Sequence, residues 1–328
     1  MPKDPFEEKL LQYSKELDEI RKEMSKIVVG QKDIVDALLR GIVANSHILV
    51  EGLPGIGKTM MIRALSEIMG CEFKRVQFTP DLLPSDIVGI NTYEKERGFY
   101  VLKGPIFSNF VLADEINRAP PKVQSALLEG MQEKQVTIGR ETFALPVPFF
   151  VMATQNPIEQ LGTFPLPEAE LDRFMFKINV YYPSIEDEQK ILKQNMTTSK
   201  FESFNLKPIM NPEKIVEMQE SAKQIFLHEK IEKYIVTLID ATRNPSKYDL
   251  TLGKYISRGA SPRASLGLYI GAKAEALIAG KKFVTPYHVK RVAIDIMRHR
   301  IAINYDGESA GITSDKVIKE ILEKIPIP

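Results

Sequence analysis

The stretch HILVEGLPGIGKTMMIRAL, residues 47–65, decides the fold of this chain. It begins with an apolar run of strand length, passes through a glycine-rich turn and continues with the apolar spacing of a helix. Residues 52–59, GLPGIGKT, fit the pattern G-x-x-x-x-G-K-[ST] at every position. A strand that turns through glycines into a helix, with Lys-Thr at the turn, is typical of a phosphate-binding loop and not of an ordinary glycine corner.

The residue types in this loop suit a nucleotide triphosphate. Glycines let the backbone fold back so that its N–H groups face the phosphates, and the following helix N-terminus adds partial positive charge. Lys58 supplies a full charge to the β- and γ-phosphates, and the Thr59 hydroxyl is a ligand for Mg²⁺. The residues predicted to bind ATP here are Gly52, Leu53, Pro54, Gly55, Ile56, Gly57, Lys58, Thr59 and Met60.

A second motif closes the apolar run NFVLADE, residues 109–115. Asp114 at the end of a buried strand can reach Mg²⁺ directly or through water, and Glu115 can polarise the attacking water as a general base. Two carboxylates could also mark a solvated strand end, but the phosphate loop upstream favours the catalytic interpretation. The guanine-reading tetrapeptide Asn-Lys-x-Asp is absent from the sequence, which argues against a GTPase switch.

Strand and helix patterns alternate around these motifs over residues 30–182, which predicts an α/β fold with a five-stranded parallel sheet. The strands are expected at residues 47–51, 73–78, 109–115, 148–156 and 173–180. The helices are expected at residues 6–24, 31–45, 58–69 and 121–132. Two further segments, residues 90–103 and 135–147, have the alternation and glycine-containing tips of hairpins.

The pattern changes after Tyr181-Tyr182-Pro183, because residues 184–328 show helical periodicity and no clear strand. Ser261-Pro262 and Thr285-Pro286 each place a capping hydroxyl before a proline, which marks a helix start. We therefore expect an α/β nucleotide-binding domain over residues 1–183 and a smaller all-helical lid domain over residues 184–328.

Composition narrows the class of protein further. A length of 328 residues suggests about two domains. The 44 basic against 43 acidic side chains argue against a chain that binds polyanions as a whole, which leaves a local basic patch as the alternative. The single cysteine, Cys71, excludes an intramolecular disulfide and a cysteine-based zinc site. The charged N-terminus and the lack of any run of 18 apolar residues predict neither a signal peptide nor a membrane span, so a cytoplasmic location is expected.

Three polar residues occupy positions in the sequence at which a bound ligand would account for their residue type. Asn156 ends an apolar strand and could orient water beside the γ-phosphate, although an Asn before a proline is equally a turn residue. Arg263 lies in the first turn of a predicted helix, where a cation is unfavourable unless an anion binds. Arg173 follows Asp172, so for both arginines a structural ion pair is the alternative.

Taken together, these motifs resemble those of the MoxR family of AAA+ ATPases. The resemblance is carried by VVGQ, GLPGIGKT, FTPDLLPSDIVG, the long run GPIFSNFVLADEINRAPPKVQSALLEGMQEKQVTIG, ATQNPIEQLGTFPLPEAELDRF and GASPRA. The tail VTPYHVKRVAIDIMRHRI is also similar to the family's C-terminal helices. The motifs occur in the family's order and cover roughly residues 25–305.

The resemblance implies a role for each matching position. It makes residues 52–59 the Walker A loop, Asp114-Glu115 the Walker B pair, Asn156 sensor 1 and Arg173 the arginine finger that acts on a neighbouring subunit's nucleotide. It makes Arg263 sensor 2, acting in cis or in trans. The other matches are Val29, Gly30 and Gln31 near the adenine, the helix-2 insert at residues 90–103, the pre-sensor-1 hairpin at residues 135–147, and Arg118 as a second inter-subunit contact.

The function that the resemblance implies is Mg²⁺-dependent ATP hydrolysis by a ring, hexameric in this interpretation. The ring would remodel client proteins such as maturing metalloenzymes, beside a von Willebrand A partner. A metal-chelatase motor subunit and a nucleic-acid motor remain alternatives. The second would favour basic, aromatic hairpin tips, whereas EKERG and IGRET carry mixed charge, so nucleic acid is not the expected partner.

Overall fold

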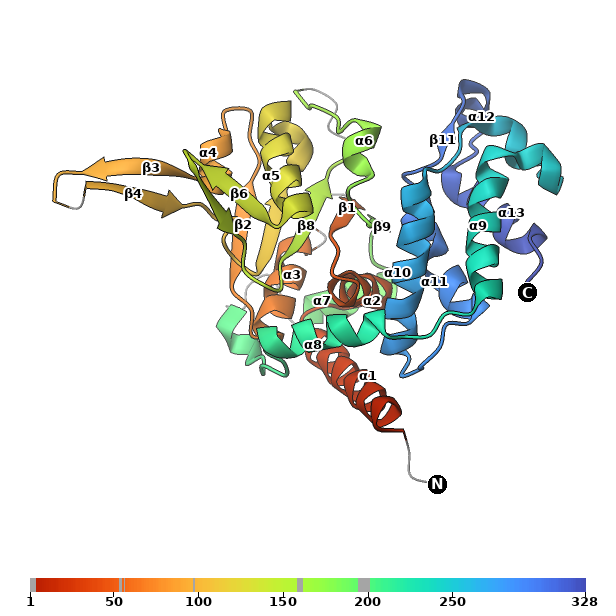
Figure 1. Ribbon diagram of the computed structural model, residues 1–328, viewed down its shortest axis with the longest axis horizontal. Coiled ribbons are helices and arrows are strands. Elements are labelled where there is room, and N and C mark those ends of the chain that lie inside the picture. The colour runs from red at the N-terminus through yellow and green to blue at the C-terminus, as the bar shows by residue number, and fades with distance from the viewer. Residues whose placement is uncertain (1–3, 53–54, 56, 97, 158–161, 194–200) are drawn as a thin grey trace. The chain divides into compact units, whose positions relative to one another are not determined.

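The chain is described from a computed structural model, which covers residues 4–52, 55, 57–96, 98–157, 162–193 and 201–328. These residues form two compact units that interleave along the sequence (Figure 1). One unit runs from Glu16 to Phe174 and from Ile178 to Glu217, and the other joins the start of α1 (Pro5–Met24) to Met175–Lys177 and Met218–Pro328. The domain boundary expected at residue 183 stays a prediction, because each unit is made of separate segments and the two units do not meet at one position of the sequence.

A five-stranded parallel sheet forms the centre of the first unit, as predicted. Its strand order is β2-β5-β8-β1-β9. The register pairs Gln77 with Asp114, Ala113 with Ala153 and Glu51 with Gln155, so the carboxyl ends of neighbouring strands lie at one edge of the sheet. The strands are β1 (Ile48–Gly52), β2 (Phe73–Gln77), β5 (Phe110–Asp114), β8 (Phe150–Gln155) and β9 (Phe176–Val180).

The last strand begins later than its sequence pattern predicts. Arg173 was expected to start it, but the N–H groups of Arg173 and Phe174 donate to the carbonyls of Glu170 and Leu171 in a turn. That turn follows the short helix α6 (Glu168–Leu171). Arg173 therefore lies between α6 and β9, on a turn and not on a strand.

Helices α2 (Lys32–Val43), α3 (Lys58–Ile68) and α5 (Pro121–Glu133) pack on the sheet through apolar side chains. These three helices and α1 are present as predicted, with ends shifted by at most two residues. Shorter elements complete the unit, namely α4 (Pro84–Val88), the 3-10 turns Ile116–Arg118 and Phe201–Phe204, and α7 (Ile185–Lys193). Helix α8 (Pro212–Lys223) runs across the division between the units.

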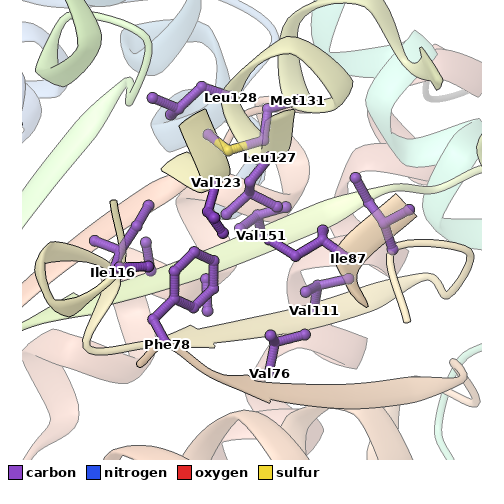
Figure 2. Packing of buried hydrophobic residues seen from close by; sticks show 14 of the residues in the cluster. Val76, Phe78, Ile87, Val111, Ile116, Val123, Leu127, Leu128, Met131 and Val151 are labelled. Atoms are coloured by element: carbon purple, nitrogen blue, oxygen red, sulfur yellow. The ribbon is translucent and has the colours of Figure 1, made fainter. Parts of the chain in front are cut away.

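The core of this unit lies between α5 and one face of the sheet (Figure 2). Each fully buried Phe or Leu side chain in such a cluster stabilises the fold by about 1.5–3 kcal/mol. The packing holds β2, β5 and β8 together and so fixes the strand ends that carry the polar motifs. The residues labelled in the view are Val76, Phe78, Ile87, Val111, Ile116, Val123, Leu127, Leu128, Met131 and Val151.

Two hairpins leave the sheet, as expected for residues 90–103 and 135–147. The first pairs β3 (Gly89–Glu94) with β4 (Gly98–Lys103) and extends well beyond the sheet of its unit (Figure 1). The second pairs β6 (Gln135–Ile138) with β7 (Glu141–Ala144). Both hairpins belong to the first unit.

The second unit is built mainly from helices, and its two predicted helix starts are confirmed. The Ser261 hydroxyl accepts from the N–H of Arg263 at the start of α10, and Thr285 forms a capping box with His288 at the start of α11. The elements are α9 (Glu229–Arg243), α10 (Pro262–Ile278), α11 (Pro286–Met297), α12 (Tyr305–Ser309), α13 (Ser314–Lys324) and the 3-10 turns Pro245–Tyr248 and Leu252–Tyr255.

This unit also contains a small sheet that the sequence did not predict. Strands β10 (Ile256–Arg258) and β11 (Ala302–Ile303) pair antiparallel. Three and two residues are too few for strand alternation to be visible in a sequence, which is why an all-helical lid was expected. Across the described parts of both units, every helix is too short or too polar to span a bilayer.

Candidate active site

The phosphate loop lies where β1 ends and α3 begins. Gly55 and Gly57 have φ of 81° and 80°, a left-handed conformation that glycine adopts without the steric cost that a side chain would bring. A Cβ at either position would meet no atom of the described residues within 4 Å. Leu53, Pro54 and Ile56, which belong to the same predicted loop, lie outside the described residues.

A cavity of about 510 Å³ opens beside this loop, at the carboxyl ends of β2 and β5. This is the edge of a parallel sheet where ligands bind, and the volume falls in the range of small-molecule sites. Predicted residues that line it are Gly55, Gly57, Lys58, Thr59, Met60, Asp114, Glu115 and Asn156. Residues that were not predicted also line it, namely Arg63, Arg75 and Gln77.

Lys58 is the cation that the loop directs toward this cavity. Its Nζ donates to the carbonyl oxygen of Gly52 at 2.6 Å, so the side chain folds back over the loop. Burial lowers the pKa of Lys58, while the charges of Asp114 and Glu115 act in the opposite direction. A half-desolvated ammonium facing two carboxylates can exchange its carbonyl partner for a phosphate oxygen.

Both oxygens of Asp114 are engaged. The Thr154 hydroxyl donates to Oδ1 at 2.7 Å, and Arg75 donates to Oδ2 through Nε at 3.1 Å and Nη2 at 2.7 Å. Charge-assisted bonds of this kind hold a carboxylate in one orientation. Thr154 also accepts from the N–H of Glu115 at 2.8 Å, so one hydroxyl on β8 places both members of the carboxylate pair.

Glu115 is held by two donors on one oxygen. Gln77 Nε2 lies 3.0 Å from its Oε2, and Arg118 Nη1 lies 2.9 Å from the same atom. Arg75 Nη2 donates to the Gln77 Oε1 at 2.7 Å, which leaves the Gln77 amide to face Glu115. The backbone of Glu115 is left-handed, with φ 57° and ψ 51°, and this conformation turns the chain out of β5.

The remaining predicted residues lie in other places. Asn156 is only 7% exposed and lines the cavity. Val29 and Gly30 line a separate cavity of about 440 Å³ in the same unit, and Gln31 precedes α2. The two arginines are not among the residues of either cavity: Arg173 occupies the turn after α6, and Arg263 the first turn of α10 in the second unit.

Sequence reasoning missed Arg75, Gln77 and Thr154. The alternation of β2 does place Arg75 and Gln77 on one face of the strand, and that was the available signal. Their importance depends on which strand lies next to β2, because only the β2-β5-β8 order brings them and Thr154 against Asp114 and Glu115.

The donor set also fits a magnesium ion bound together with nucleotide. Within the described ranges, no group of three or more His, Cys, Asp or Glu side chains is placed to hold a metal without help. Mg²⁺ is usually held by one or two protein oxygens together with substrate phosphates and water. Thr59 and Asp114 supply such oxygens in one cavity.

The chain is similar in sequence to an ATPase family and to MoxR proteins. Residues 47–176 match the ATPase family associated with various cellular activities (AAA), and residues 252–321 match the AAA lid domain. Chaperone MoxR1 of Mycobacterium tuberculosis is 44% identical over 308 residues, which cover 93% of this chain and 81% of that protein. Protein MoxR of Methylorubrum extorquens is 29% identical over 328 residues, with 94% of each chain covered.

A solved structure is similar over nearly the whole chain. The crystal structure of a candidate ATPase from Cytophaga hutchinsonii is 47% identical, with a TM-score of 0.91 over 98% of both chains. Both parts of the AAA+ architecture, the α/β core and the helical lid, are thus matched by known families in this chain. The chain belongs to the MoxR family of AAA+ ATPases.

Proposed function

We propose that this chain hydrolyses ATP with Mg²⁺ as a hexameric ring, and that it uses the energy to remodel client protein complexes. The observation that carries the hydrolytic part is one cavity that brings the phosphate loop to the carboxylate pair. The chaperone part is supported by the relative named Chaperone MoxR1. Assembly into a ring is supported by membership of the AAA+ class.

Binding would begin at the phosphate loop. Lys58 exchanges the Gly52 carbonyl for phosphate oxygens, and the N–H groups at the start of α3 add partial positive charge. Thr59 and Asp114 would hold Mg²⁺, which, when bound, neutralises charge that develops during phosphoryl transfer. Val29, Gly30 and Gln31 would lie near the adenine, by their match to the family motif.

Hydrolysis would use Glu115 as the general base. Gln77 and Arg118 both donate to its Oε2, and a carboxylate oxygen can accept the proton of an attacking water. Asn156, buried at the end of β8, would orient that water.

Arg173 and Arg263, which do not line the cavity, would complete the active site when subunits assemble into a ring. Arg173 would reach the γ-phosphate bound by the next subunit, where an added positive charge stabilises the transition state. Arg263 would act as sensor 2, either on the nucleotide bound by its own subunit or on that of a neighbouring subunit. Arg118, which pairs with Glu115, would be a second residue near the subunit boundary.

The experiment that tests the hydrolytic proposal is Glu115→Gln. We expect ATP affinity to persist while turnover falls by about 10² or more, because the base is lost and the phosphate contacts stay. Glu129→Gln on an exposed position of α5 is the matched control. Calorimetry and a steady-state phosphate assay give the two readouts, and near-normal turnover of Glu115→Gln would assign the base to another residue.

The client is proposed by class only. Metalloenzymes or other complexes in maturation, contacted through a von Willebrand A partner, fit the family. The Glu115→Gln ring should hold ATP and retain its client, so proteins captured with it but not with Lys58→Ala identify that client. Capture of a chelatase subunit, or stimulation of hydrolysis by DNA, would favour one of the two alternative motors instead.

A further inference from the structure

The start of β9 passes from one compact unit to the other. Phe174 is fully buried in the core of the α/β unit, whereas Met175–Lys177 group with the helical unit. Ile178 and the rest of the strand return to the α/β unit. Arg173, the predicted finger, directly precedes Phe174. Of the four residues that follow Arg173, the first belongs to the α/β unit and the next three belong to the helical unit.

Two arginines at the end of α11 hold this segment to the helical unit. Arg300 Nη1 donates to the carbonyl of Met175 at 3.0 Å, and Arg298 Nη1 donates to the carbonyl of Lys177 at 3.0 Å. Alternate residues of an extended chain direct their carbonyls to the same side, which is why two arginines spaced by two residues can bind both.

Arg298 and Arg300 are themselves firmly placed. Arg298 forms two bonds to Asp315 of α13, from Nε at 3.0 Å and from Nη2 at 2.9 Å, and it lies 3.6 Å from Asp295. Arg300 is buried and also donates to the carbonyl of Ile296. Because these side chains are hydrogen-bonded both to their own unit and to the start of β9, their χ angles are restricted. A displacement of α11 would therefore also displace the backbone to which they are bonded.

Side-chain packing reinforces the same attachment. A Cβ on Gly271 of α10 would lie 2.8 Å from Ile296 Cδ1 and 3.4 Å from the Phe176 ring. A Cβ on Gly267 would lie 2.9 Å from Ile296 Cγ2 and 3.8 Å from Met175 Cγ. The glycines therefore allow α10, α11 and the start of β9 to approach closely, and this contact leaves little room for the strand to slide.

We propose that Arg298 and Arg300 are positioning residues for Arg173. They attach the backbone just after Arg173 to the helical unit, so a displacement of that unit is passed to the finger through Phe174 and Met175. The inference rests on the proposed function, in which Arg173 acts on the nucleotide of the next subunit. A shift of about 1 Å at a reacting group is enough to change a rate by about 10²-fold.

The test uses mixed rings that separate the subunit that donates the finger from the subunit that binds ATP. A Lys58→Ala subunit is the donor, since its own phosphate loop is inactive and its Arg173 is intact. An Arg173→Ala subunit is the acceptor, since its phosphate loop is intact and its finger is missing. Each is inactive by itself, and mixing restores hydrolysis at donor–acceptor boundaries.

Arg298→Lys is then added to one partner at a time. Lysine keeps the charge for Asp315 but lacks the planar fork that also reaches the Lys177 carbonyl. We expect the restored activity to fall by about tenfold when Arg298→Lys is in the donor, and to stay unchanged when it is in the acceptor. Arg300→Lys should give the same asymmetry, and Arg291→Lys, from the same helix and paired with Glu275, should affect neither arm.

The outcomes are distinct once ring formation has been checked by analytical ultracentrifugation. A loss confined to the donor arm supports the inference, because general damage to the helical unit would appear in both arms. Equal losses, a loss in the acceptor arm only, or no loss in either arm would overturn it. If the parent mixture stays inactive although mixed rings form, the trans role of Arg173 fails, which is seen before Arg298 is changed.

Discussion

At the scale of single residues, the site depends on which donors hold its charged groups. Asp114 and Glu115 each pair with an arginine and with one uncharged side chain, and Arg75 and Gln77 join the two carboxylates into one network. Lys58 faces the same carboxylates from the phosphate loop. The balance of charge in this cavity is therefore set by a few side chains that can be changed one at a time.

Lys58→Ala is expected to abolish ATP binding. The variant removes the full positive charge that the phosphate loop offers to the β- and γ-phosphates. Isothermal calorimetry measures the affinity, and Lys122→Ala, an exposed lysine on α5, is the control. Unchanged affinity for ATP would remove the nucleotide-binding role from this loop.

His47 should make folding stability depend on pH. It is buried, its Nε2 donates to the Met131 carbonyl at 3.0 Å, and its Nδ1 accepts from the N–H of Val151 at 3.1 Å. Burial lowers its pKa from 6.5 to about 4, so the unfolded chain takes up the proton first. The contribution of neutral His47 is complete above pH 6.5 and is lost as the pH falls from 6.5 toward 4.

The loss over that window is expected to be up to about 3 kcal/mol. Urea unfolding at pH 7.5 and pH 5 measures about 2 kcal/mol of this loss, with His47→Gln compared to His228→Gln at an exposed position. The Gln variant at position 47 should lose part of the pH dependence that the exposed variant keeps. Equal slopes for both variants and the parent would show that His47 does not carry the effect.

The parts of the site that could be predicted are those whose chemistry is contiguous in the sequence. The phosphate loop and the Asp-Glu pair are local patterns, and they lie in one cavity. Thr154 and Gln77 are ordinary strand residues until the neighbours of their strands are known. Long-range strand order, not local spacing, decides that they contact Asp114 and Glu115.

At the scale of elements, the β3–β4 hairpin contributes little buried apolar area to the core of its unit. Tyr93 and Phe99 form a cross-strand pair with ring centroids 5.0 Å apart, and they are 62% and 83% exposed. Ile90 and Leu102 on the opposite face of the ribbon are exposed as well. Aromatic residues left in water at the end of a protruding ribbon favour a contact surface for a client.

Replacing residues 93–99 by a short Gly/Ser link should leave folding and basal hydrolysis nearly intact but impair client remodelling. The double variant Tyr93→Ser/Phe99→Ser is a milder version with the same expected result, since it removes the aromatic pair and keeps the turn. Thr137→Ala/Thr142→Ala, which removes the cross-strand pair of the other hairpin, is the control. Thermal unfolding and the phosphate assay are the first measurements, and a large fall in Tm would show that the β3–β4 tip is structural.

Element prediction succeeded where the apolar pattern is long and failed where it is short. The five core strands and both helix starts with proline were predicted, because each is fixed by four or more residues or by a cap. The two- and three-residue strands β11 and β10 carry no such pattern. The start of β9 was placed too early because Phe174 continues its apolar alternation while hydrogen-bonded in the preceding turn.

At the scale of the whole molecule, hydrolysis should depend on assembly. If Arg173 completes the site of a neighbouring subunit, specific activity rises with protein concentration until rings are full. Arg173→Ala should bind ATP normally and hydrolyse it about 10³-fold more slowly, as for other trans arginine fingers. Sedimentation and phosphate release over the same dilution series measure both quantities, and a specific activity independent of concentration while rings dissociate would contradict a shared site.

The left-handed backbone of Glu115 has a consequence for how this protein can evolve. A side chain in that conformation costs on the order of 1 kcal/mol, and glycine or asparagine would adopt it more easily. Selection for thermal resistance alone would thus favour replacing the very residue proposed to activate water. At position 115 the residue that favours folding stability differs from the residue proposed to favour hydrolysis. Related or selected sequences that keep glutamate there have therefore been selected for hydrolysis, and those that replace it have been selected for stability.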